Sequence, residues 1–129
     1  MTQRPGLLIV DSDVIVRHNL AEYLRDCGYH VVEASTSDEA ITFLENEDVS
    51  VEAVLADVKA AGSMNGFALA QWVRENRKDT DVVLVGSIEG AMDKASGLCE
   101  EGDNLQKPYD PQIVLDRIKQ LRAERDRNA

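Results

Sequence analysis

Leu7-Leu-Ile-Val10 is the first of four short apolar runs that decide the fold, and the polar residues Asp11-Ser12-Asp13 follow it directly. The other three runs are equally short and rich in β-branched residues: Val31-Val32 with Ala34, Ala53-Val-Leu-Ala56, and Val82-Val-Leu-Val85. Such runs are typical of strands that are buried on both faces of a parallel sheet. Asn104-Leu-Gln106 is a weaker candidate for a fifth strand.

Segments in which apolar residues recur at helical spacing separate these runs. Five helices are predicted: Val14 to Leu24 ending at Cys27-Gly28, Ala40 to Leu44 opened by Thr36-Ser-Asp-Glu39, Phe67 to Val73, Met92 to Cys99, and a last helix opened by Asp110 and Pro111. Glycine suits a helix C-cap, Thr36 to Glu39 has the pattern of a capping box, and Pro fits a first helical turn.

Strand and helix therefore alternate five times, which predicts an α/β domain with a parallel sheet and helices on both faces. Right-handed crossovers leave few topologies for such a chain. The leading candidate is a doubly wound (βα)5 domain with the flavodoxin-like strand order 2-1-3-4-5. We expect one domain over residues 1–129, with a core over 6–121 and a charged, fraying tail over 122–129.

Charge and composition exclude several classes of protein. The chain has 24 acidic residues against 14 Lys and Arg, a net charge of −10, so direct nucleic-acid binding is not expected. No apolar stretch has the length of a membrane span or a signal peptide, and we expect a cytoplasmic protein that does not bind membranes. Cys27 and Cys99 form no CxxC or Cys/His cluster, so the sequence predicts two packed thiols without zinc or a disulfide.

Polar residues follow the apolar runs at the points where ligands bind in open parallel sheets. Asp11 and Asp13 follow the first run, Asp57 the third, Gly86 and Ser87 the fourth, and Lys107 the candidate fifth. Carboxylates gathered there would raise one another's pKa. A Mg²⁺ ion, which accepts one or two carboxylates together with carbonyl and water ligands, would resolve that conflict.

This arrangement predicts phosphoryl chemistry. Asp57 is the better nucleophile, because it ends a buried strand and leads into the loop 58–65, where Gly62 and the following Gly66 let the backbone fold around a ligand. Lys107 would neutralise phosphoryl oxygen charge. A simpler interpretation stays open for each residue taken alone, since Asp13 could only cap the first helix.

From Leu7 to about Leu121 the sequence resembles the receiver domains of bacterial two-component response regulators. The resemblance rests on Leu8-Ile-Val-Asp11, Val54-Leu-Ala-Asp57, Gly62-Ser-Met-Asn-Gly66, Val82-Val-Leu-Val85 and Lys107-Pro-Tyr109, taken in this order and spacing. It implies that Asp57 accepts a phosphoryl group from a sensor histidine kinase or phosphotransfer protein. It further implies that Asp11, Asp57 and the backbone carbonyl of Lys59 bind Mg²⁺, and that Lys107 contacts the phosphoryl group.

The sequence departs from the family pattern at Ser12, Gly86 and Asn104, and at Ala60-Ala61, where the family usually has Leu-Pro in the loop after the phosphoacceptor. Ser12 replaces the second acid that usually follows the first strand, which weakens the expected Mg²⁺ affinity. Gly86 stands where the family has a switch Thr or Ser, and Ser87 is a displaced hydroxyl one residue later, where a strand faces the other way. Asn104 stands where an aromatic residue is common.

Three functions therefore remain open. The first is a working receiver, a monomer or weak dimer that is not an enzyme beyond phosphorylating itself from small donors and dephosphorylating itself. The second is a degenerate receiver that binds a protein partner without phosphorylation. A distant third is a small haloacid-dehalogenase-like phosphatase, in which Asp11 would be the nucleophile and Asp13 the acid/base. The sequence does not indicate the cognate kinase or the downstream partner.

Overall fold

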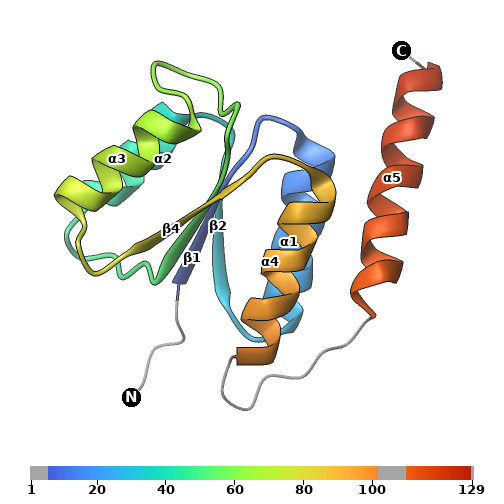
Figure 1. Ribbon diagram of the computed structural model, residues 1–129, viewed down its shortest axis with the longest axis horizontal. Helices are drawn as coiled ribbons and strands as arrows, with labels where there is room; N and C mark the ends of the chain where they lie inside the picture. The colour runs from blue at the N-terminus through green and yellow to red at the C-terminus, as the bar shows by residue number, and fades with distance from the viewer. Residues whose placement is uncertain (1–5, 102–109, 129) are drawn as a thin grey trace.

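The computed structural model describes residues 6–101 and 110–128 (Figure 1). Its strands are β1 (Gly6–Val10), β2 (His30–Ala34), β3 (Ala53–Asp57) and β4 (Asp81–Val85). Its helices are α1 (Val14–Asp26), α2 (Ser37–Leu44), α3 (Gly66–Asn76), α4 (Ile88–Glu101) and α5 (Pro111–Asn128). Strand and helix alternate as predicted, and the candidate fifth strand at Asn104-Leu-Gln106 lies outside the described residues.

The four strands form one parallel sheet in the order β2-β1-β3-β4. This order confirms the first four positions of the predicted topology. In the register of the sheet, Val10 lies beside Ala56 and Asp57 lies beside Val85. The carboxyl ends of β1, β3 and β4 therefore reach the same edge, where ligands bind in this class of fold.

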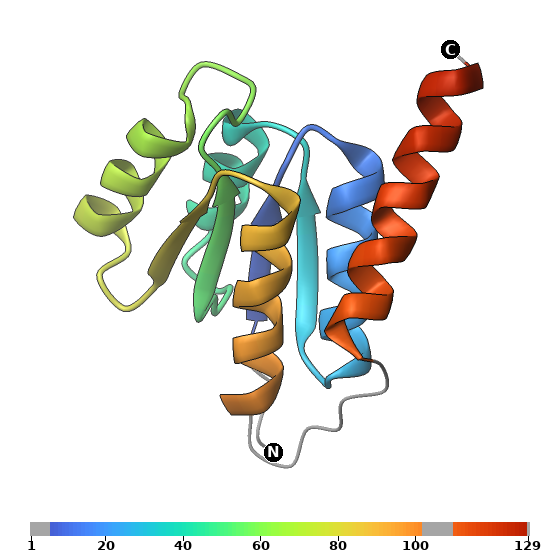
Figure 2. The same cartoon turned by 45° about the vertical axis from the view of Figure 1, so that its right-hand side comes forward.

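Helices cover both faces of the sheet, as the alternation predicts (Figure 2). α2 and α3 share one apolar core with Leu8, Val10 and Val54. α1, α4 and α5 share the other core with Leu7, Ile9 and Val85. Alternate residues of β1 thus face opposite cores, which explains why this strand is apolar throughout.

Burial differs between the strands. β1 and β3 are buried almost completely, as their sequences predict, whereas the middle of β4 at Val82, Val83 and Leu84 is only partly buried. β4 is the outermost strand of the described sheet on its side, so its apolar side chains have fewer neighbours.

Capping residues set the helix starts near the predicted positions. Asp13 accepts hydrogen bonds from the backbone N–H groups of Ile15 and Val16, at 3.0 and 3.3 Å, which confirms the capping interpretation of this acid. Thr36 caps α2 through the Glu39 N–H at 3.1 Å. Glu39 bonds back to Ser35 rather than to Thr36, so the predicted capping box is only half formed. No helix in the described ranges is long and apolar enough to cross a membrane.

The prediction of two separate thiols is wrong, because Cys27 and Cys99 form a disulfide with a Cα–Cα distance of 5.6 Å. Their separation of 72 positions along the chain conceals this proximity in the sequence. Both cysteines lie at the C-terminal ends of helices that follow parallel strands, and α1 and α4 pack in the same core. Packing two such helices side by side brings their C-terminal ends together.

α5 continues to Asn128, past Leu121, into the segment where the sequence predicts a charged, fraying tail. Two arginines of this extra length form ion pairs with Asp13: Arg122 Nε lies 3.1 Å from Oδ2, and Arg125 Nη2 lies 3.5 Å from the same oxygen. These contacts give the charged end of α5 a partner on the rest of the domain, which the sequence alone did not indicate.

Candidate functional site

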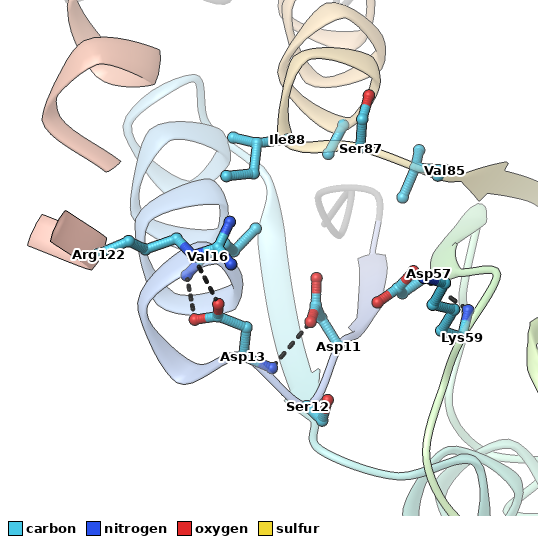
Figure 3. Close-up of a pocket in the computed structure, with 12 residues that line it drawn as sticks. Asp11, Ser12, Asp13, Val16, Asp57, Lys59, Val85, Ser87, Ile88 and Arg122 are labelled. Atoms are coloured by element: carbon cyan, nitrogen blue, oxygen red, sulfur yellow. Dashed lines mark hydrogen bonds and ion pairs between the residues drawn. The ribbon is translucent and has the colours of Figure 1, made fainter. Parts of the chain in front are cut away.

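The ends of three strands enclose a polar cavity of about 210 Å³ (Figure 3). Asp11 and Ser12 reach it after β1, Asp57 at the end of β3, and Gly86 and Ser87 after β4. Asp13, Lys59 and Arg122 complete its polar lining. The structure thus brings together the sequence-predicted site residues that it describes.

Asp11 is the most buried acid of the cavity, with only 9% of its surface exposed. Its Oδ1 accepts the backbone N–H of Asp13 at 2.8 Å, and Arg17 donates to its backbone carbonyl at 3.0 Å. Burial, reinforced by the negative charges of Asp57 and Asp13, raises the pKa of Asp11 to about 6. The hydrogen bond from Asp13 and the charge of Arg17 oppose this shift. A bound cation would stabilise the ionised form.

Asp57 is partly buried at the end of β3, and its carboxylate is turned toward the same space as that of Asp11 (Figure 3). One of its oxygens accepts the backbone N–H of Lys59 at 3.2 Å. Because Asp57 closes a strand whose preceding four residues are buried, its backbone is fixed while its carboxylate reaches the cavity. A nucleophile requires this combination of a fixed backbone and an accessible carboxylate.

The loop after Asp57 is fastened to the start of α2. The Ser63 hydroxyl and backbone N–H both donate to the Asp38 carboxylate, the latter at 3.0 Å, and they hold the pKa of Asp38 below its ordinary value. The buried Ser37 hydroxyl accepts the Met64 N–H at 3.1 Å, and the Ser37 N–H donates to the Ala61 carbonyl at 2.8 Å. Gly62 turns the loop with a positive φ of 109°. We call this set of contacts the loop clamp.

The donor set fits Mg²⁺ better than a metal that requires many side-chain ligands. No cluster of three or more His, Cys, Asp or Glu side chains suited to a metal occurs within residues 6–101 and 110–128. Mg²⁺ is commonly held by one or two carboxylates and retains several waters. Asp11 and Asp57 supply two carboxylates, and Lys59 follows on the same loop with a backbone carbonyl.

Two departures from the receiver pattern, Ser12 and Gly86, line the cavity, and so does Ser87, which follows Gly86. Ser12 lines the cavity but is exposed, and it brings no charge. Ser87 also lines the cavity, but its hydroxyl accepts the Gly90 N–H at 3.0 Å and points toward α4 (Figure 3). Ser87 therefore serves as a cap of α4 in this structure. Asn104 and Lys107 lie outside the described residues.

Gly86 leaves open space where a side chain would stand. A Cβ built at this position meets only Val58 Cγ2, at 3.9 Å, which is an ordinary van der Waals contact. We expect Gly86→Ser to fold with a free energy of unfolding within about 0.5 kcal/mol of the parent, because no atom has to move. Urea denaturation of both proteins would measure this difference. A loss of more than 2 kcal/mol would contradict the described conformation of Gly86.

Two groups of residues near the site are absent from the prediction that the sequence supports. One is the loop clamp, whose signal was the surplus of polar residues in Thr36-Ser-Asp-Glu39 beyond those that a capping box uses. The other is the pair Arg122 and Arg125, which contacts Asp13 from α5. Their three-residue spacing places both on one helix face, but no local pattern identified Asp13 as their partner.

Two regulators of known sequence are similar over most of this chain. The transcriptional regulatory protein AruR of Pseudomonas aeruginosa is 30% identical over 125 residues, covering 94% of this chain and 50% of AruR. The aerobic respiration control protein ArcA of Escherichia coli K12 is 31% identical over 121 residues, covering 92% of this chain and 49% of ArcA. The chain therefore spans about half the length of these relatives.

Solved structures show the same likeness. A CheY-like response regulator receiver domain protein from Methanospirillum hungatei has a TM-score of 0.60 and 25% identity, covering 98% of this chain and all of its own. The non-phosphorylated HemR receiver domain from Leptospira biflexa has a TM-score of 0.59 and 27% identity, covering 89% of this chain and 94% of its own. Residues 7–119 match the family described as response regulator receiver domain. The chain belongs to the receiver domain family of two-component response regulators.

Proposed function

We propose that this receiver accepts a phosphoryl group on Asp57 from a phosphohistidine of a sensor histidine kinase or phosphotransfer protein in the cytoplasm. The observation that carries the proposal is the position of Asp57, whose carboxylate shares one cavity with Asp11 at the carboxyl ends of β1, β3 and β4. Receiver domains are in general signalling domains rather than enzymes. In this proposal Asp57 is accordingly the acceptor and not a catalyst of turnover.

The transfer forms one bond and breaks another. A carboxylate oxygen of Asp57 attacks phosphorus as the bond from phosphorus to the imidazole nitrogen breaks, and the electron pair of that bond stays on the nitrogen. The products are an aspartyl phosphate and a free histidine on the donor. Catalysis of such a transfer depends mainly on positioning and charge stabilisation. The end of β3 and the loop clamp supply the positioning.

Asp11, Asp57 and the backbone carbonyl of Lys59 are the groups that would hold Mg²⁺. The ion would supply positive charge against the oxygens of the incoming phosphoryl group. Asp11 contributes by ionising, and its contact with the Asp13 N–H keeps its carboxylate oriented. Lys107, by the family resemblance, would neutralise the remaining phosphoryl charge. Ser12 lacks the charge of a second acid, so we expect the Mg²⁺ affinity to be weak for a receiver.

The aspartyl phosphate would act by shifting a conformational equilibrium toward the state that binds the phosphoryl group better. α4 adjoins the site, because Ile88 and Ala91 of its first turns line the cavity. Because the Ser87 hydroxyl caps α4, a shift of this hydroxyl toward the phosphoryl group would change the start of the helix. We propose a protein as the downstream partner, without direct contact of this domain to nucleic acid.

Intact-mass measurement after incubation with acetyl phosphate tests the proposal. We expect a Mg²⁺-dependent gain of one phosphoryl group in the parent and in Asp93→Asn, a matched charge change on the exposed side of α4. We expect complete loss of the adduct in Asp57→Asn. An adduct that vanishes only in Asp11→Asn would support the phosphatase hypothesis. If the parent forms no adduct at any Mg²⁺ concentration, the working-receiver proposal is wrong, and binding without phosphorylation becomes the better hypothesis.

A further inference from the structure

The disulfide between Cys27 and Cys99 joins the C-terminal end of α1 to that of α4. The cavity is lined by residues near the opposite, N-terminal ends of both helices, Val16 and Ile88. Cys27 is the C-cap of α1 and Cys99 lies in the last turns of α4. Both cysteines are at least 98% buried, with exposures of 1% and 2%. The Tyr29 hydroxyl donates to the Leu98 carbonyl at 2.8 Å and fastens the same end of α4.

The other end of α4 belongs to the functional site. Ile88 and Ala91 line the cavity, and Ser87 caps the helix beside them. At a rise of about 1.5 Å per residue, the helix spans roughly 16 Å between Ile88 and Cys99. A single rigid element therefore connects the cavity with the disulfide, so a restraint at one end limits movement at the other.

α4 lies on a different face of the sheet from the one that the predicted strand order requires. α2 and α3 connect strands from β2 to β3 and from β3 to β4, and both lie on one face. A right-handed connection from β4 that continues in the same direction, as the predicted order 2-1-3-4-5 requires, would place α4 on that face too. In the structure α4 lies on the opposite face, packed with α1 and α5.

The face of the sheet that α4 does not occupy has partly exposed apolar side chains against which the helix could pack. Val82 and Leu84 of β4 point toward the α2 and α3 core but are only partly buried. Trp72 of α3 packs against the same core and is likewise partly buried. α4 itself is apolar along the side that carries Ala91, Met92, Ala95 and Cys99, all of which are buried in its present position. Both positions would therefore bury apolar surface.

We propose that Cys27 and Cys99 form a redox modification site that selects between two positions of α4. With the disulfide formed, α4 is held against α1, as in this structure. With the disulfide reduced, α4 is released and packs over Val82 and Leu84 beside α3. Because α4 reaches the cavity, the thiol redox state then reshapes the wall formed by Ile88 and Ala91.

The redox step is a thiol–disulfide exchange with a small thiol such as glutathione. One glutathione thiolate attacks one cysteine sulfur, the S–S bond breaks, and the other cysteine leaves as a thiolate that takes up a proton. A second glutathione thiolate then attacks the mixed disulfide and releases the first cysteine. In sum, two glutathione thiols are oxidised to glutathione disulfide and the protein disulfide is reduced to two thiols. Because both sulfurs are buried, the attack requires opening of a helix end.

The test compares the whole chain after incubation with glutathione disulfide and after reduction with dithiothreitol. Intact mass with thiol alkylation would establish the state of the two cysteines. We expect reduction to speed hydrogen exchange at least about tenfold in the part of α1 that α4 covers, and to shift the fluorescence of Trp72, the only tryptophan of the chain, to shorter wavelength. The double variant Cys27→Ala/Cys99→Ala should give the reduced pattern in both buffers.

Two results would overturn the inference. One is a failure of glutathione disulfide to form the intramolecular disulfide in the folded protein. The other is a disulfide that forms while α1 exchange and Trp72 fluorescence remain the same in both states, which would make it a static crosslink. None of these measurements uses a phosphoryl donor, so the inference does not depend on whether Asp57 is phosphorylated.

Discussion

Replacing Gly66 with alanine is expected to destabilise the domain by about 2–3 kcal/mol and to remove most of the phosphoryl adduct on Asp57. A Cβ at position 66 would lie 2.3 Å from the carbonyl oxygen of Asp57 and 2.7 Å from the Cα of Val58. Both are backbone atoms that cannot turn away as a side chain would. The loop must therefore shift, and the shift acts directly on the residue that carries the proposed nucleophile.

Gly97 provides a matched control for this substitution. It lies inside α4, and a Cβ built there meets nothing within 4 Å. Gly97→Ala should raise the free energy of unfolding by about 0.5–1 kcal/mol, because alanine is the better helix former. Urea denaturation and acetyl phosphate labelling of both variants measure the contrast. A Gly66→Ala variant with parental stability would show that the loop does not approach Asp57 as described.

Asp11→Asn is expected to raise the free energy of unfolding, in contrast to Gly66→Ala, and to remove Mg²⁺ binding. Above pH 6 the buried carboxylate of Asp11 is charged beside Asp57, and its raised pKa of about 6 means that this charge opposes folding. Asparagine keeps an oxygen that can accept the Asp13 N–H but carries no charge. At pH 7.5 without metal, we expect the variant to be more stable than the parent by about 1–3 kcal/mol.

The raised pKa of Asp11 also sets the direction in which the stability of the protein changes with pH. The folded chain holds the Asp11 proton more tightly than the unfolded chain, where the pKa is near its ordinary value of 3.8. The protonated form of Asp11 therefore stabilises the folded state fully below about pH 4, and this contribution is lost as the pH rises through 6. The difference between parent and variant should vanish in acid and grow toward neutral pH.

Urea denaturation at several pH values would measure this difference, with Asp93→Asn on an exposed part of α4 as the control. Added Mg²⁺ should stabilise the parent and leave Asp11→Asn unchanged, since only a protein that binds the ion gains stability from it. A variant that is less stable than the parent at pH 7.5 without metal would contradict the electrostatic assignment.

Most of the fold could be predicted from the sequence because its signals are local. The runs Leu7 to Val10 and Ala53 to Ala56 are buried strands as predicted, and Asp13 and Thr36 start helices through hydrogen bonds within three residues. The contacts that the sequence did not reveal join distant segments. The Cys27–Cys99 disulfide is the clearest example, because it depends on which face of the sheet α4 occupies rather than on any spacing.

The candidate site likewise has a part that the sequence predicts and a part that it does not. Convergence of Asp11, Asp57 and Ser87 follows from one general property, the common edge reached by the ends of parallel strands. Side-chain orientation does not follow from it, and the hydroxyl of Ser87 turns out to cap α4. The ion pairs of Asp13 with Arg122 and Arg125 require knowledge of where α5 lies, which a one-dimensional pattern does not contain.

The loop clamp has a consequence for the entropy of ligand binding. A free eight-residue loop would lose about 1–2 kcal/mol of conformational freedom per residue when a ligand ordered it. In this chain the hydrogen bonds of Ser63 to Asp38, and of Met64 to Ser37, already fix the loop 58–65 when the protein folds. Any ion or phosphoryl group that binds beside Asp57 therefore meets a preorganised loop, and its binding enthalpy is not offset by the ordering of the backbone.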